Sequence, residues 1–228
     1  MIRTFLAALI FAASMPATGA AAPARVDHVI IGVYDLRTGM AELERMTGVR
    51  PVFGGVHPGR GTQNALLSLG SGTYLELLAA NPAERVRSTD VLELSGLKKP
   101  TPIGWAVSGD NLNSLRRRVR LAGVGVTSVN PGSRRRRDGV ILHWQTFGYA
   151  RLDDPGAPFF IIWNDRLQHP SRTSPAGCQL KSLTITTPQA PRLRQAIASL
   201  ALHVVVRKAR QSGMKVAMDC PKGRVVLG

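Results

Sequence analysis

The order in which predicted strands and helices follow one another constrains this fold most, because the same order returns along the chain. In residues 26–80, the alternation of "VDHVIIGV" predicts a strand, and Asp35 and Gly48 are suited to begin and end a helix. Three further strands are predicted at "VRPVF", "NALLSL" and "TYLELL". The first unit is therefore strand, helix, strand, strand, strand.

The second unit covers residues 101–165, where Asp110 is suited to cap the helix and "GVILHWQTFGYA" and "APFFIIWND" supply the last two strands. A third, shorter unit covers residues 178–228. Repeated units of this kind bury their apolar faces against one another. The sequence predicts an α+β fold of tandem βαβββ units, with curved mixed sheets and covering helices.

The first 22 residues have the layout of a signal peptide, with Arg3, a short apolar stretch and small residues before the cleavage point. The apolar stretch is too short for a stable membrane anchor, which is the alternative interpretation. We therefore expect a secreted or periplasmic protein, in which Cys178 and Cys220 could be oxidised. If the first and fourth strands of the third unit are neighbours, a disulfide between these cysteines is favoured over two free, buried thiols.

The chain is strongly basic, with a formal charge of +16 and arginine runs at 116–120 and 134–137. Export argues against a nucleic acid partner, so an anionic small molecule or peripheral contact with an anionic envelope becomes the expected partner. For most of these arginines we favour a simpler role, on a solvated helix face and at a charged hairpin tip. The sequence gives no indication of oligomeric state.

The stretch "GGVHPGRGTQNALLSLGSGTYLELL" places one carboxylate, Glu76, among apolar residues of a strand. An isolated buried carboxylate is costly, so a partner is expected. In the preceding loop, Arg60 and Asn64 are suited to bind a carboxylate or carbonyl oxygen. The loop is not a phosphate-binding P-loop, and the chain has no G-x-S-x-G motif.

The tandem units resemble the glyoxalase-like domain proteins of the vicinal oxygen chelate superfamily. The phrases that carry the likeness are "DHVIIGVYDL", "GGVHPGRGTQNALLSL", "YLELL", "DGVILHW", "PFFIIW" and "HPS", which span residues 26–171. In this superfamily two units curl around a cleft, and metal ligands come from the first and fourth strands of each unit. The resemblance implies that His28 and Glu76 are ligands of Zn, Fe, Mn or Ni, with Glu76 also the catalytic residue.

The second unit departs from this pattern, because the matching positions fall at about Gly104 and at Ile161 or Ile162, which cannot bind a metal. His57 and His143 are candidates to replace the missing ligands, and His57 is the one included in the predicted metal site. For His57 a loop-structuring role is the alternative, and for His143 a substrate contact is as plausible as chemistry.

Two functions remain open from the sequence. The first is a metal-dependent lyase, isomerase or dioxygenase acting on a small oxygenated molecule. The second is a non-catalytic protein that binds or sequesters a small molecule after losing the metal. Substrate contacts are predicted from Arg60, Asn64, Trp105, His143 and Trp144. A third and weaker alternative is a cationic envelope protein that uses the repeat only as a scaffold.

Overall fold

The computed structural model describes residues 23–85 and 89–228, so the predicted signal peptide, residues 1–22, lies outside the described residues. The first unit has the predicted order: β1 (Arg25–Gly32), α1 (Leu36–Thr47), β2 (Val52–His57), β3 (Thr62–Ser68) and β4 (Tyr74–Ala80). The Asp35 side chain caps α1 by accepting a hydrogen bond from the Thr38 N–H. Gly48 ends the helix in the left-handed region, at a φ of 80°.

The second unit contains β5 (Thr101–Ser108), α3 (Leu112–Leu121), β6 (Asn130–Arg135), β7 (Ile141–Phe147) and β8 (Phe159–Trp163). Its helix cap is Asn111 and not Asp110, because the Asn111 side chain accepts from the Ser114 N–H. The linker between the units forms a short helix, α2 (Thr89–Ser95), which the sequence did not predict.

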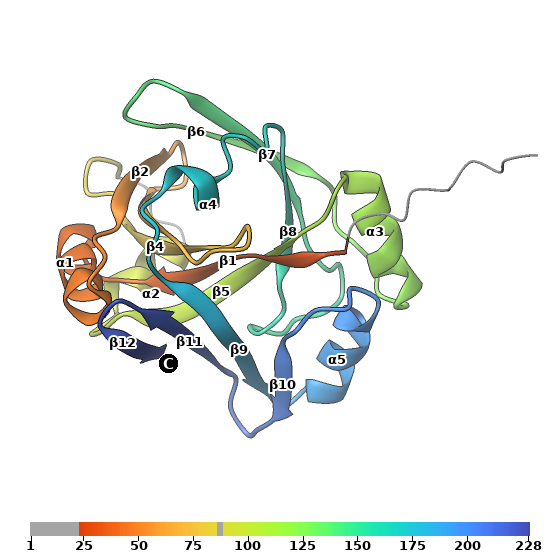
Figure 1. Ribbon diagram of the computed structural model, residues 1–228. Coiled ribbons are helices and arrows are strands. Elements are labelled where there is room, and N and C mark those ends of the chain that lie inside the picture. Colours follow the sequence, from red (N-terminus) through yellow and green to blue (C-terminus); the bar gives the residue numbers. More distant parts are fainter. Residues whose placement is uncertain (1–22, 86–88) are drawn as a thin grey trace, which may run out of the picture.

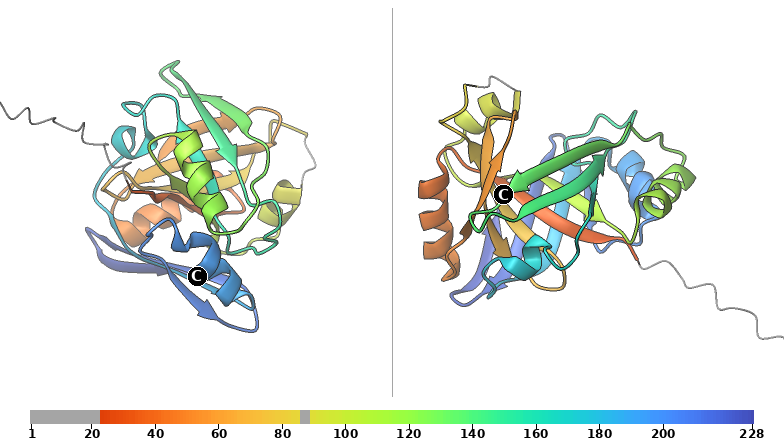
Figure 2. Two further views of the ribbon diagram at one scale, coloured as in Figure 1. Left: turned by 90° about the vertical axis from the view of Figure 1, so that its right-hand side faces the viewer. Right: turned by 90° about the horizontal axis from the view of Figure 1, so that it is seen from above.

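The two units share one sheet of eight strands, in the order β2-β3-β4-β1-β5-β8-β7-β6. Within each unit the first and fourth strands pair in parallel, as predicted, and antiparallel pairing of β1 with β5 joins the units. The two outermost strands, β2 and β6, contact each other, so the sheet curls until it is nearly closed. Figures 1 and 2 show this curl from three directions.

Two glycines of β2 permit close approaches, Gly54 to side chains of β3 and Gly55 to the backbone of β6. A Cβ atom on Gly54 would lie 2.3 Å from Asn64 Oδ1, and one on Gly55 would lie 2.6 Å from the Arg135 carbonyl oxygen. Gly55 also has a φ of 141°, which L side chains rarely adopt. The second glycine of the "GGVHPGRG" stretch therefore serves the contact between β2 and β6, and the first leaves room for Asn64 of β3.

The third unit follows a short helix, α4 (Pro170–Thr173), and contains β9 (Gln179–Thr187), α5 (Ala190–Ala198), β10 (Val205–Lys208), β11 (Gly213–Cys220) and β12 (Gly223–Leu227). It forms a separate sheet in the order β10-β9-β11-β12. The expected pairing of its first and fourth strands is wrong, because β9 lies between β10 and β11. A tight turn keeps β12 beside β11, its antiparallel partner.

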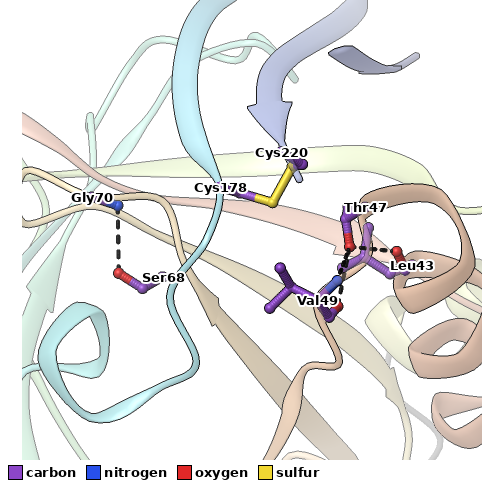
Figure 3. The surroundings of a disulfide bond; sticks show 7 residues. All are labelled: Leu43, Thr47, Val49, Ser68, Gly70, Cys178 and Cys220. Carbon is purple, nitrogen blue, oxygen red and sulfur yellow. Dashed lines mark hydrogen bonds between the residues drawn. A yellow bond between two sulfur atoms is a disulfide. The ribbon is translucent and has the colours of Figure 1, made fainter. Parts of the chain in front are cut away.

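The disulfide between Cys178 and Cys220 is nevertheless formed, as Figure 3 shows. Cys178 comes directly before β9, and Cys220 ends β11. Because β9 and β11 are antiparallel, the start of one lies beside the end of the other, and Asp219 is in register with Gln179. The predicted disulfide is therefore present, but the pairing of β9 with β11 brings the two cysteines together, not the expected pairing of the first and fourth strands.

The third unit covers the outer face of the large sheet, below β1 and β5 in Figure 1. Leu183, Ile185 and Met218 of the small sheet belong to the same buried cluster as Val29 and Ile31 of β1. This cluster is the apolar core of the protein. In the described part of the chain, none of the helices is long and apolar enough to cross a membrane.

Candidate functional site

The inner face of the curled sheet lines a cavity of about 620 Å³. Successive side chains of a strand point to opposite faces, so His28 and Ile30 of β1 line the cavity while Val29 and Ile31 enter the core. By the same alternation, Glu76 of β4 points into the cavity. Both units contribute to the wall, which is the arrangement expected from the sequence.

Glu76 lies at the floor of the cavity with only 7% of its surface exposed. Its Oε1 accepts a hydrogen bond from Asn64 Nδ2 at 2.6 Å. The two imidazoles approach from either side: His28 Nε2 lies 3.6 Å from Oε2, and His57 Nε2 lies 3.7 Å from Oε1. The carboxylate and the histidine of the first strand are thus neighbours in one cavity.

His28 is held from behind by Asp27, whose carboxylate is fully buried. Asp27 Oδ1 lies 2.8 Å from His28 Nδ1 and accepts from Trp163 Nε1 at 3.2 Å, while Oδ2 lies 3.1 Å from His169 Nε2. Burial acts to raise the pKa of Asp27, but hydrogen bonds from His169 and His28 outweigh it and hold that pKa far below its ordinary value. Asp27 is therefore ionised and fixes the orientation of the His28 ring.

The sequence analysis assigned no role to Asp27 or His169. Asp27 could have been noticed as a second charged residue in an apolar strand, directly before His28. His169 belongs to the "HPS" phrase, but its distance along the chain from Asp27 gave no sign that the two are in contact.

His57 ends β2 and faces the cavity, although the sequence placed it in the following loop. Its Nδ1 lies 2.9 Å from Thr62 Oγ1, and Asn64 Nδ2 lies 3.2 Å from its Nε2. Burial lowers the pKa of His57, and this effect outweighs the opposing influence of Glu76. His57 is therefore a neutral imidazole at neutral pH.

Tyr74 lies next to Glu76 on the same face of β4, and its ring stacks on that of His28 with the centroids 4.6 Å apart. Burial raises the pKa of Tyr74 well above its ordinary value. Its hydroxyl therefore keeps its proton and is available as a donor to a ligand in the cavity.

The predicted substrate contacts are only partly brought together. Asn64, Arg60 and Trp144 line the cavity. Trp105 touches its wall but is fully buried, with Nε1 donating to the Gly156 carbonyl oxygen at 2.8 Å. His143 is exposed and does not line the cavity; it faces a separate shallow depression on the other side of Trp144.

The donor types for a divalent metal are present, since two imidazoles and one carboxylate can bind Zn, Fe, Mn or Ni. Their arrangement does not fit one. The amide nitrogen of Asn64 lies between His57 Nε2 and Glu76 Oε1 and donates to both, so only His28 Nε2 and Glu76 Oε2 remain open, fewer than the roughly three protein ligands of an open metal site. Across the cavity, Gly104 and Ile161 offer no donor atom. Among residues 23–85 and 89–228, no group of three His, Cys, Asp or Glu side chains forms a metal site.

Two βαβββ units that share one curled sheet around a cavity define a protein of the vicinal oxygen chelate superfamily, whose members often bind a divalent metal. The model of the family described as "Glyoxalase-like domain" matches residues 26–201, and the chain belongs to this family. The resemblance inferred from the sequence is thereby confirmed.

A solved structure supports the fold. A hypothetical protein from Staphylococcus aureus superposes with a TM-score of 0.65 over 90% of this chain and 99% of that one, at 11% identity. Methylmalonyl-CoA epimerase from Mycobacterium tuberculosis is 22% identical over 66% of this chain and 92% of that one, with a TM-score of 0.44. No curated protein matches the sequence.

Proposed function

We propose that the protein is an enzyme of isomerase type, which removes and returns a proton on a small oxygenated molecule. One observation carries the proposal: Glu76 is a nearly buried carboxylate that faces a cavity large enough for a substrate. Asn64 fixes one of its oxygens, and no described residue donates a hydrogen bond to the other. A carboxylate held in this way is suited to act as a general base.

The chemistry follows from the groups around Glu76. A C–H proton next to a substrate carbonyl would pass to Oε2, and the electron pair of that bond would move to the carbonyl oxygen. The Tyr74 hydroxyl, which stays protonated, is a donor beside Glu76 on the same wall. Return of the proton to the same or the neighbouring carbon would complete an isomerisation, and no net oxidation is involved.

The alternative is a protein that binds its ligand without reaction. Three cavity-lining residues of the second unit favour it, because Gly104, Phe159 and Ile161 present no reactive group to the cavity. The two functions differ in whether a bound carbonyl compound exchanges its C–H protons with solvent.

Replacing Glu76 with glutamine is expected to abolish this exchange, because glutamine has the shape of the side chain but cannot accept the proton. The protein would be incubated in D₂O with 2-oxo acids, 3-oxo acids and hydroxyketones, and deuterium incorporation followed by NMR. We expect Glu76→Gln to lower the rate by about 100-fold or more.

Glu93→Gln is the matched control, because Glu93 is an exposed carboxylate on the wall of the same cavity. It should leave exchange unchanged. Binding of these compounds without any exchange in the unaltered protein would support the binding function instead. Exchange that persists in Glu76→Gln would exclude Glu76 as the base.

We further propose that the reaction does not depend on a resident metal, because Asn64 donates to His57 Nε2 and to one oxygen of Glu76, which leaves only His28 Nε2 and Glu76 Oε2 open. Protein loaded with Zn²⁺, Fe²⁺, Mn²⁺ or Ni²⁺ and then desalted is expected to retain well below one ion per chain, as measured by elemental mass spectrometry. Retention of about one ion, lost on His28→Ala or Glu76→Ala, would instead establish the metal-dependent enzyme, since an open metal site needs about three protein ligands.

We also propose that the protein is exported, on the basis of the signal-peptide pattern of residues 1–22. The disulfide between Cys178 and Cys220 supports this proposal, because such bonds persist in oxidising compartments.

A further inference from the structure

We propose that Arg134 binds a carboxylate of the ligand, so that the cavity takes small organic acids. The inference deepens the proposed function by naming its substrate class, and it rests on that function only for the reaction that follows binding. It starts from a residue that the sequence analysis placed, with its neighbours, at a solvated hairpin tip.

The structure corrects that placement for Arg134 alone. Arg135 is exposed and donates to the Gly139 carbonyl oxygen, Arg136 pairs with Asp138, and Arg137 lies over the Phe53 ring. Arg134 is only 2% exposed, and its side chain lines the cavity. Alternation along β6 thus directs Arg134 inward and Arg135 outward.

The guanidinium of Arg134 has more donors than partners. It carries five N–H bonds, but in the described part of the chain it donates only to the Gly54 carbonyl oxygen. None of the carboxylates there lies within 4.0 Å of its nitrogen atoms, since it takes part in none of the ion pairs. A buried cation with unused donors that faces a cavity is a site for an anion.

Burial also has an electrostatic consequence. Desolvation lowers the pKa of Arg134, while Tyr74 and Glu76 act in the opposite direction. The ordinary pKa of a guanidinium is so high that Arg134 remains charged at neutral pH. A buried charge without a close counter-ion is unfavourable, because the desolvation of the guanidinium is not compensated. An anionic ligand would supply the counter-ion and offset this unfavourable free energy.

The shape of the site favours a carboxylate. A guanidinium presents parallel N–H bonds that match the two oxygens of a carboxylate. The wall of the cavity that Arg134 shares with Glu76 also includes apolar residues such as Ile30, Leu78 and Ile161, which suit a carbon skeleton. A ligand held by its carboxylate at Arg134 would extend over this wall toward the base, with a carbonyl near Glu76.

The test compares acids with their uncharged counterparts. Pyruvate, 2-oxobutanoate, 4-methyl-2-oxopentanoate and phenylpyruvate would be titrated by calorimetry beside their methyl esters. We expect at least one acid to bind at least about tenfold more tightly than its ester. We expect Arg134→Gln to remove this preference and Arg134→Lys, which keeps the charge but not the paired donors, to retain part of it.

Arg135→Gln is the matched control, because it removes the same charge from the adjacent position of β6 on the exposed side. It should leave the preference for the acid intact. Circular dichroism and thermal melting of each variant would establish that it is folded. If Arg134→Gln does not fold, the preference for acid over ester is compared between Arg134→Lys and the unaltered protein. Equal binding of every acid and its ester in the unaltered protein, or a preference that survives in folded Arg134→Gln, would overturn the inference.

Failure of this inference can be told from failure of the proposed function. If acid binding depends on Arg134 but proton exchange persists in Glu76→Gln, Arg134 is supported as the carboxylate-binding residue and Glu76 is rejected as the general base. If proton exchange depends on Glu76 but proceeds equally well in Arg134→Gln, Glu76 is supported as the general base and Arg134 is rejected as the carboxylate-binding residue.

Discussion

Replacing Trp105 with alanine is expected to lower the free energy of unfolding by about 4 kcal/mol. Trp105 is fully buried in the core and lies on β5 opposite Val29 of β1, at the junction of the two units. Truncation would leave a cavity that the sheet cannot fill, because both neighbouring strands are held by their backbone hydrogen bonds. Urea denaturation followed by circular dichroism would measure the loss.

Trp105→Phe separates the two contributions of this side chain. Phenylalanine fills most of the volume but leaves the Gly156 carbonyl oxygen without its donor, so a loss of about 1–3 kcal/mol is expected. Trp144→Ala is the control, since Trp144 is half-buried on the cavity wall and should cost less stability. A stable Trp105→Ala protein with impaired ligand binding would restore the substrate-contact role predicted from the sequence.

Removing the disulfide is expected to cost a similar amount, about 4 kcal/mol for a pair separated by 42 residues. The bond joins the start of β9 to the end of β11 beside the end of α1 (Figure 3). At the same place the Lys222 N–H donates to the Thr47 carbonyl oxygen. The double variant Cys178→Ala/Cys220→Ala should therefore unfold at a lower denaturant concentration than the unaltered protein. Reductant should shift the unfolding midpoint of the unaltered protein toward that of the variant.

The double variant also serves as the control for the reductant, since it has no disulfide to break and its own transition should not move. Coincident transitions for the oxidised protein and the double variant would show that the third unit is held by its apolar contacts alone.

The sequence predicted the elements of the first unit because the relevant signals are local. In the second unit, β6 (Asn130–Arg135) includes Arg134 and Arg135, which the sequence had placed at a hairpin tip. Apolar alternation marked the strands, and Asp35 and Gly48 marked the ends of α1. The neighbourhood of His28 and Glu76 also followed, since closing each unit requires its first and fourth strands to pair. In the third unit the same rule failed, because short strands joined by a tight turn paired in chain order instead.

The remaining parts of the site depend on contacts between distant segments, which local patterns do not encode. Asp27 meets His169 only because the segment after β8 returns to β1. Arg134 could not be told from the three arginines after it, since its burial depends on where the edge of β2 lies. Asn64 was identified as a polar contact, but its position between His57 and Glu76 required coordinates.

The meeting of β2 and β6 has a mechanical consequence. Neighbouring strands in the order of the large sheet are joined by ladders of backbone hydrogen bonds, whereas β6 is joined to β2 by the hydrogen bond from the Arg134 guanidinium to the Gly54 carbonyl oxygen. The contact between β2 and β6 is therefore the weakest connection between adjacent strands around the curled sheet. An acid bound at Arg134 would contact the same side chain that links β6 to β2, so ligand binding and closure of the sheet would depend on one residue.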